Sequence, residues 1–405
     1  MKFFSTLKSL FQIPGYGGFS AALMMFGIAY SYVLPYTSLF AITEAKMSTR
    51  ELGIFLTLMS VSSIVISTYL ARVSDRGSNR KWILMFGLLA SAAGYLLFSE
   101  VRNFYLLVLI ACTLLAVGSS AFPQLFAFAR TRLQEQEVEK PELAISTLRT
   151  FFSLAWVIGP ATGALLLGAF GFPWLYRVAA ACAIAAALIV LQFKTTQARN
   201  QSQTPVQPLG TVLRNPTVAA IFGGFTLLSV AGALSQIALP LRVVKDLQGS
   251  ETQVGLLFSL AAGLEIPFMV FFGAIASRLP KSRLILAAAV LQGVYFLVIG
   301  QATEIWQLFP AQILTALVVS ITMGLGISYF QDLLPEAPGL ATTLNANSSR
   351  MGSILSGLLF GTLGSVLSHA QLFLVCMGMC WLCAVLLFFF GREKHLQAYH
   401  KARLS

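Results

Sequence analysis

The chain has 405 residues, of which 57% are hydrophobic and 10% are charged. Soluble domains carry about 25% charged residues, so these side chains could not cover a water-exposed surface, and a soluble protein is excluded. The composition instead predicts a protein that crosses a membrane many times, and the net charge of +12 has to be explained within that class.

Apolar runs of about 17–25 residues, the length that crosses a bilayer, recur between short polar breaks. They predict twelve membrane-spanning helices over residues 16–40, 51–71, 82–99, 104–129, 143–168, 174–193, 217–240, 252–277, 284–300, 305–334, 339–367 and 371–390. The segment 194–215 is rich in Gln, Thr, Asn and Pro and holds no apolar run. We therefore expect an all-α membrane protein with a six-helix bundle at 1–193, a cytoplasmic linker at 194–215, and a second six-helix bundle with a cytoplasmic tail at 216–405.

Basic residues in the loops predict the orientation. If both termini are cytoplasmic, the cytoplasmic segments hold 19 of the 27 Lys and Arg residues and the opposite loops hold six. Bacterial inner-membrane proteins keep their basic loops on the cytoplasmic side, so both termini are expected there. This bias also accounts for the positive charge, so no nucleic-acid partner is needed, and we expect a monomer in the lipid bilayer.

The two halves repeat. Segment 48–76 aligns with 250–278 at a constant offset of 202, which matches Ser48 with Ser250 and Gly53 with Gly255. Parallel repeats of six spans are typical of the two halves of a major facilitator transporter.

Glu265 is the acid that lies deepest in any predicted span, about 18 Å from either end of its helix. Acids at this depth face a cavity or a charged partner, because exposure to lipid costs a few kcal/mol. Glu265 could carry a proton, form a fixed ion pair or accept a hydrogen bond from a solute. Arg350 lies at a similar depth, about 16 Å into a span that also carries Asn345 and Asn347, so Glu265 and Arg350 are the candidates for proton coupling. The sequence leaves open whether Glu265 pairs with Arg350 or with Arg149.

Further polar and aromatic side chains within the spans suit a polyhydroxylated solute, since amides donate and accept together and aromatic faces allow stacking. Each of these side chains could equally form a structural hydrogen bond to a neighbouring helix. The candidate solute-binding residues, with Glu265, are Tyr30, Gln124, Trp156, Gln236, Gln331, Asn345 and Asn347.

The loop from Ser74 to Lys81 contains Asp75 and Arg76 and resembles the loop signature of major facilitator transporters. These two residues could latch the halves together on the cytoplasmic side, or belong to an ordinary basic loop. Arg149 and Asp332 are further candidates for gating, with alternatives of a snorkelling side chain for Arg149 and a helix cap for Asp332. Residues 159–163 (Gly-Pro-Ala-Thr-Gly) resemble the Gly-Pro motif of major facilitator antiporters and favour export.

Several blocks resemble the bacterial sugar efflux transporters of the major facilitator superfamily. They are Leu-Ala-Trp-Val-Ile-Gly-Pro at 154–160, Ala-Ala-Gly-Leu-Glu-Ile-Pro at 261–267, Phe-Gln-Asp-Leu-Leu-Pro at 330–335, Ala-Thr-Thr-Leu at 341–344 and Pro-Gln-Leu-Phe-Ala at 123–127. The resemblance implies proton-driven export of sugars or small glycosides, with no catalytic residue, metal or cofactor. A multidrug exporter of the same fold is the alternative. A membrane enzyme or receptor is disfavoured, since the sequence offers neither a catalytic cluster nor a large soluble region. The sequence also lacks a nucleotide-binding loop, which disfavours an ATP-driven pump.

Overall fold

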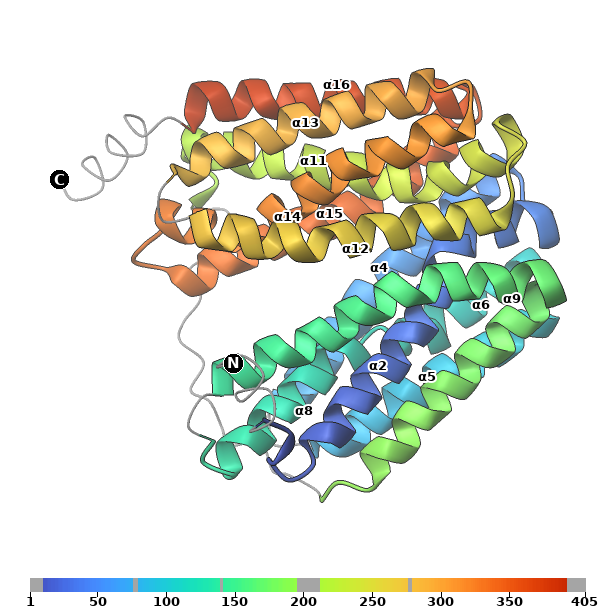
Figure 1. Ribbon diagram of the computed structural model, residues 1–405, viewed down its shortest axis with the longest axis vertical. Helices are drawn as coiled ribbons and strands as arrows, with labels where there is room; N and C mark the ends of the chain where they lie inside the picture. Colours follow the sequence, from blue (N-terminus) through green and yellow to red (C-terminus); the bar gives the residue numbers. More distant parts are fainter. Residues whose placement is uncertain (1–9, 76–78, 139–140, 195–211, 276–278, 392–405) are drawn as a thin grey trace. The chain divides into compact units, whose positions relative to one another are not determined.

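The computed structural model describes residues 10–75, 79–138, 141–194, 212–275 and 279–391, except for the side chains of Asp75 and Glu142. This described part is built of helices (Figure 1). In the first half these are α2 (Tyr16–Val33), η1 (Leu34–Tyr36), α3 (Thr37–Leu39), η2 (Phe40–Glu44), α4 (Thr49–Asp75), α5 (Arg80–Glu100), α6 (Phe104–Ile110), η3 (Ala111–Leu115), α7 (Ala116–Gly118), α8 (Ala121–Glu135) and α9 (Pro141–Leu191). In the second half they are α11 (Pro216–Leu241), η4 (Arg242–Asp246), α12 (Glu251–Ile275), α13 (Lys281–Gln301), η5 (Ile305–Gln307), α14 (Leu308–Leu333), α15 (Pro338–Leu363) and α16 (His369–Phe390).

Ten of the described helical segments are long and apolar enough to cross a membrane. One of them, in α9, contains two spans, because the helix is interrupted at Gly171, whose φ of 77° and ψ of 178° are not helical. Helix α15 is long enough but falls outside the ten, and the polar side chains along it explain why. The described residues thus contain the twelve predicted spans, apart from residues 276 and 277 at the end of one of them, and the predicted all-α membrane fold is confirmed.

The chain divides into two compact units. One unit contains Met1–Met47 and Leu58–Ser202, and the other contains Ser48–Thr57 and Gln203–Ser405. The first turns of α4 therefore belong to the second unit, although the rest of this helix belongs to the first. The predicted linker lies mostly outside the described residues, and its boundaries at 194 and 215 stay a prediction.

In the first unit, α2 and α5 both pack against the long helix α9. Close approach of α2 is possible because small residues face it, and Gly159 lies against Ser31. Hydroxyl groups on α2 and its extension then bond to α9: Ser31 Oγ donates to the carbonyl of Ala155 at 3.2 Å, and Tyr36 donates to that of Pro160 at 2.5 Å. These bonds hold the first and fifth spans in a fixed rotation.

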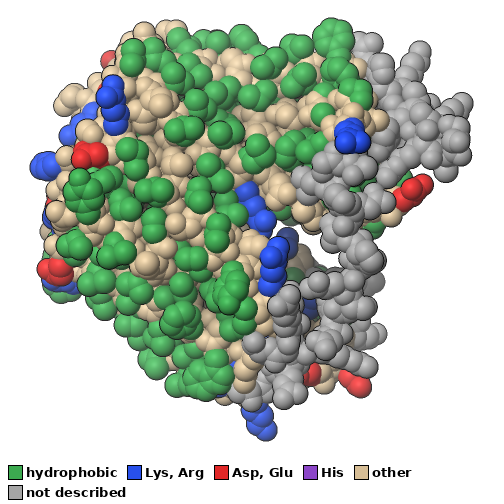
Figure 2. Space-filling view, turned by 180° about the vertical axis from the view of Figure 1, so that it is seen from behind, with side chains coloured by type: hydrophobic (Ala, Val, Ile, Leu, Met, Phe, Trp, Pro, Cys, Tyr) green, Lys and Arg blue, Asp and Glu red, His purple; other side chains and the backbone are tan. Residues whose placement is uncertain are grey.

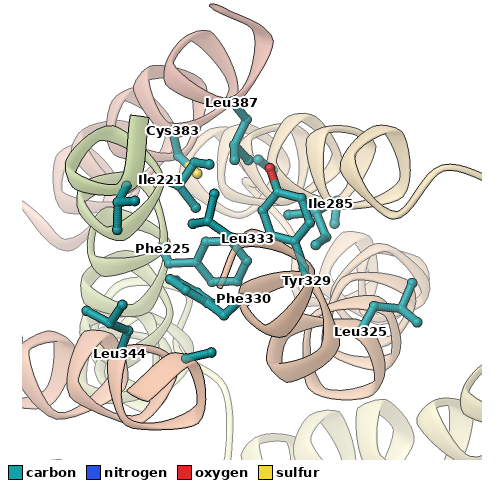
Figure 3. Close-up of a cluster of buried hydrophobic side chains, with 14 of the residues drawn as sticks. Ile221, Phe225, Ile285, Leu325, Tyr329, Phe330, Leu333, Leu344, Cys383 and Leu387 are labelled. Atoms are coloured by element: carbon teal, nitrogen blue, oxygen red, sulfur yellow. The ribbon is translucent and has the colours of Figure 1, made fainter. Parts of the chain in front are cut away.

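In the second unit, α11 packs against α15 and α16, while α14 packs against α12 and α13. Figure 3 shows the core between these helices, where the Phe225 ring of α11 meets the rings of Tyr329 and Phe330 on α14. Aliphatic side chains from α13, α15 and α16 close around the three rings. This core fixes the rotation of α14, which also packs against α12, the helix that carries Glu265.

The two units repeat one another in detail. The π-helical turn η2 begins at Phe40 and η4 begins at Arg242, an offset of 202. Two residues after each turn the backbone enters the left-handed region, with φ of 54° at Lys46 and 56° at Gln248. The helix that follows each turn starts with the same reciprocal cap, between Ser48 and Glu51 in α4 and between Ser250 and Gln253 in α12, again at an offset of 202.

Large apolar side chains remain exposed on many of the helices. On α5, for example, Phe86 is 60% exposed and Leu89 is 47% exposed. Figure 2 shows hydrophobic side chains spread over most of the visible face. Exposure on this scale fits contact with lipid, since a soluble monomer rarely exposes large contiguous apolar patches.

Candidate functional site

Glu265 lies inside α12, 14 residues after Glu251 and 10 before Ile275, which corresponds to about 21 Å and about 15 Å along the helix. Its side chain is partly buried. Pro267 follows within the same helix and has no amide hydrogen to donate, so the backbone next to Glu265 lacks one helical hydrogen bond. In the described part of the chain, the carboxylate of Glu265 makes neither a hydrogen bond nor an ion pair.

A serine fixes the backbone at Glu265. Ser320 Oγ on α14 donates to the carbonyl of Glu265 at 3.1 Å. The first unit has the same bond between the equivalent helices, from Ser119 Oγ to the carbonyl of Ser63 at 3.3 Å. Because 63 and 265 differ by 202, Ser63 occupies in the first unit the position that Glu265 occupies in the second. The repeat thus sets the depth of this position, and only the second unit places a carboxyl group there.

Arg350 belongs to the same unit as Glu265, on α15, and its side chain is exposed. Among the described residues it forms no ion pair, so the predicted pairing with Glu265 is not made in this conformation. The surrounding face of α15 is polar, with Asn345 and Asn347 partly buried and Ser348 Oγ donating to the carbonyl of Asn345 at 2.7 Å. A face of this kind needs water or polar partners rather than lipid.

The polar residues at the end of α14 contact neighbouring helices. Gln331 Nε2 lies 3.4 Å from Thr342 Oγ1 on α15. Asp332 forms an ion pair with Lys281 at the start of α13, with 2.7 Å between Oδ2 and Nζ. Asp332 therefore connects the ends of α13 and α14, a contact that the sequence did not predict. Gln236, on α11, is exposed.

In the first unit, the structure brings Tyr30 and Trp156 together. Their ring centroids lie 6.0 Å apart in an edge-to-face arrangement, although the two residues are far apart in sequence. Tyr30 is 37% exposed, and Trp156 is partly buried. Gln124 is different, because it is buried and its Oε1 accepts from Ser74 Oγ at 3.0 Å. In this conformation, Gln124 holds the end of α4 against α8.

The predicted gating residues are only partly visible. Arg76 lies outside the described residues, and of Asp75 only the backbone is described, at the end of α4. Arg149 is exposed on α9, and its guanidinium carbon lies 5.7 Å from the centroid of the Phe126 ring. The ring under Arg149 was not anticipated, although Phe126 lies within a sequence block singled out above.

Two repeated six-helix bundles, with ionisable and amide side chains at the depth of the membrane, define a membrane transporter. The sequence model of the Major Facilitator Superfamily matches residues 19–237 and 221–403. A protein of Deinococcus radiodurans is 38% identical to this chain over 89% of it and 93% of the relative. The chain belongs to the major facilitator superfamily and, within it, to the family of bacterial sugar efflux transporters.

Two further relatives are named as sugar efflux transporters. Sugar efflux transporter A of Dickeya chrysanthemi is 34% identical over 87% of this chain and 90% of the relative. Sugar efflux transporter C of Escherichia coli is 34% identical over 90% and 92%. Among solved structures, the nucleoside transporter NupG superposes with a TM-score of 0.80 over 94% of this chain and 100% of the other. At 13% identity, that similarity shows the fold alone.

Proposed function

We propose that this protein exports sugars or small glycosides across the bacterial inner membrane in exchange for protons. We infer the solute class from the relatives named as sugar efflux transporters, which are 34% identical to this chain over most of both chains. In this proposal both termini are cytoplasmic, and the two bundles joined by the linker at 194–215 open alternately to either side.

Glu265 is the proposed proton carrier, and Arg350 is its proposed charged partner in the same unit. A carboxylate this deep in a span is stabilised by a cation or by protonation, since an uncompensated charge is costly there. Its carboxylate makes no ion pair with another described residue, so a proton remains free to bind and leave as access alternates. Proton loading from outside would then drive solute outward.

Each unit offers candidate groups for the solute. Tyr30 and Trp156 offer exposed or partly buried ring surface, and Gln236, Asn345 and Asn347 offer amides. Gln124 and Gln331 have protein partners in this conformation and could exchange them for solute hydroxyls. Asp75, Arg76 and Asp332 are proposed to close the cytoplasmic end.

The decisive experiment uses the full-length protein in proteoliposomes. Radiolabelled lactose counterflow measures solute exchange, and an imposed pH gradient measures proton coupling. We expect Glu265→Gln to retain exchange and lose the response to the gradient, because an amide cannot carry a proton. Glu251→Gln, at the first turn of the same helix, is the matched control and should respond like the unmodified protein. An unchanged gradient response in Glu265→Gln would refute the carrier role.

A multidrug exporter of the same fold is the second candidate. The observation that favours it is the exposed aromatic surface of the first unit, which includes Tyr30 and the 39% exposed ring of Phe122. Exchange of lipophilic cations without exchange of any sugar would decide for this function.

A further inference from the structure

Five aromatic side chains of the first unit, here called the aromatic stripe, lie in two contacting groups: Phe122 and Phe126 on α8 with Phe152 on α9, and Tyr30 on α2 with Trp156 on α9. Phe122 lies 5.1 Å from Phe126 and 4.6 Å from Phe152, measured between ring centroids. Phe152 and Trp156 are four residues apart and so share a helix face. Trp156 then meets Tyr30 at 6.0 Å.

The stripe lies at the edge of the buried core: Phe126 and Phe152 pack against that core, whereas Tyr30 and Phe122 are exposed. Phe122 is 39% exposed and Tyr30 is 37% exposed, and the other three rings are partly buried. The neighbouring Phe128 on α8 is, by contrast, fully buried. Ring surface of the stripe is therefore open to a ligand.

One cation accompanies the stripe. Arg149 precedes Phe152 by three residues and Trp156 by seven, so it shares their face of α9, and its guanidinium lies over the ring of Phe126. Within the described residues Arg149 makes no hydrogen bond and no ion pair. Other arginines of this unit are engaged: Arg102 lies 3.5 Å from Glu44, and Arg177 lies 2.6 Å from Glu100.

This charge argues against a surface that only faces lipid. A guanidinium among acyl chains is costly, and Arg149 lies six residues, or about 9 Å, inside the apolar segment that begins at Leu143. Glu135, a described acid on α8, already pairs with Arg132 at 3.2 Å. The stripe therefore presents open rings beside a positive charge that pairs with none of the acids described in this unit.

We propose that the aromatic stripe binds carbohydrates that carry an anionic substituent, a carboxylate or a phosphate. The rings take the apolar face of the sugar, and Arg149 receives the anion through paired N–H donors, the geometry in which guanidinium groups bind carboxylate and phosphate. This inference rests on the proposed sugar export and extends it from neutral to acidic sugars. It also assigns Arg149 to the ligand rather than to a gate.

The test is equilibrium binding to the full-length protein in lipid nanodiscs. Glucose, glucuronate and glucose 6-phosphate each compete with radiolabelled lactose, and glucuronate and glucose 6-phosphate separate the two sources of the anion. We expect at least one acidic sugar to bind about tenfold to a hundredfold more tightly than glucose, the range of a hydrogen bond to a charged group. Arg149→Gln should reduce that ratio about tenfold or more, and Arg149→Lys should reduce it less.

Two controls keep the result interpretable. Arg72→Gln, which removes an exposed arginine from α4, should leave the ratio unchanged. Trp156→Ala should weaken neutral and acidic sugars by a similar factor, whereas Trp156→Phe should retain most of the binding. This inference is overturned if glucose and lactose bind but neither acidic sugar binds more tightly than glucose. It is also overturned if Arg149→Gln leaves the ratio of the acidic-sugar affinity to the glucose affinity unchanged. In both cases the proposed function stands. If no sugar binds at all, the proposed function fails.

Discussion

The start of α4 packs against α15 through glycines, and this contact allows a quantitative prediction. A Cβ atom on Gly53 would overlap the Cα of Gly361 and lie 2.5 Å from its amide nitrogen and 2.8 Å from the carbonyl oxygen of Gly357. All three are backbone atoms, which no rotamer change can move aside. Gly53→Ala therefore forces the two helices apart by about 1 Å, and overpacking of this kind costs about 1–3 kcal/mol.

The measurement is thermal unfolding of the purified protein, followed by intrinsic fluorescence. Alanine is a better helix former than glycine by about 1 kcal/mol, which offsets part of the loss. Gly324→Ala on α14 is the matched control, because its added Cβ would meet no atom within 4 Å. We expect Gly53→Ala to unfold at a lower temperature than Gly324→Ala. A midpoint equal to or above that of the control would refute the close-packing explanation.

Two further predictions concern hydrogen bonds in the first unit. Lys81 is buried, and its Nζ donates to the carbonyls of Leu191 and Phe193 at 2.7 and 2.6 Å. Lys81→Met should therefore destabilise the protein by about 1–3 kcal/mol in the same thermal assay, and an unchanged midpoint would contradict this role. For the bond between Ser74 and Gln124, a double-mutant cycle with Ser74→Ala and Gln124→Ala should give a coupling of about 0.6 kcal/mol, the average for such bonds inside membranes. A coupling indistinguishable from zero would mean that the bond adds nothing to stability.

Most of the fold could be predicted from the sequence. The bilayer requires a similar length of every span, so runs of that length located the helices. They also located the helix over 339–367, although its polar side chains keep it below the hydropathy of the other spans. The repeat was visible because Ser48 and Gly53 have counterparts 202 residues later. The π-helical turns η2 and η4 were not predicted, because no residue type marks a turn with one extra residue.

The sequence predicted how deep the site residues lie in their helices, but not which side chains they contact. Counting residues along a helix locates Glu265 well, since the rise per residue is constant. Pairing depends on the rotation of each helix, which packing decides. Thus Asp332 contacts Lys281, and Gln124 accepts from Ser74, although neither partner was expected. The roles of Glu265 and Arg350 stay predictions.

Helix α4 runs without a break from Thr49 to Asp75, yet its first turns belong to one unit and the remainder to the other. The boundary between the two units therefore falls inside a continuous helix, near Thr57, rather than in a loop. Main-chain hydrogen bonds of α4 run across that boundary, so a proline placed there would disturb both units at once.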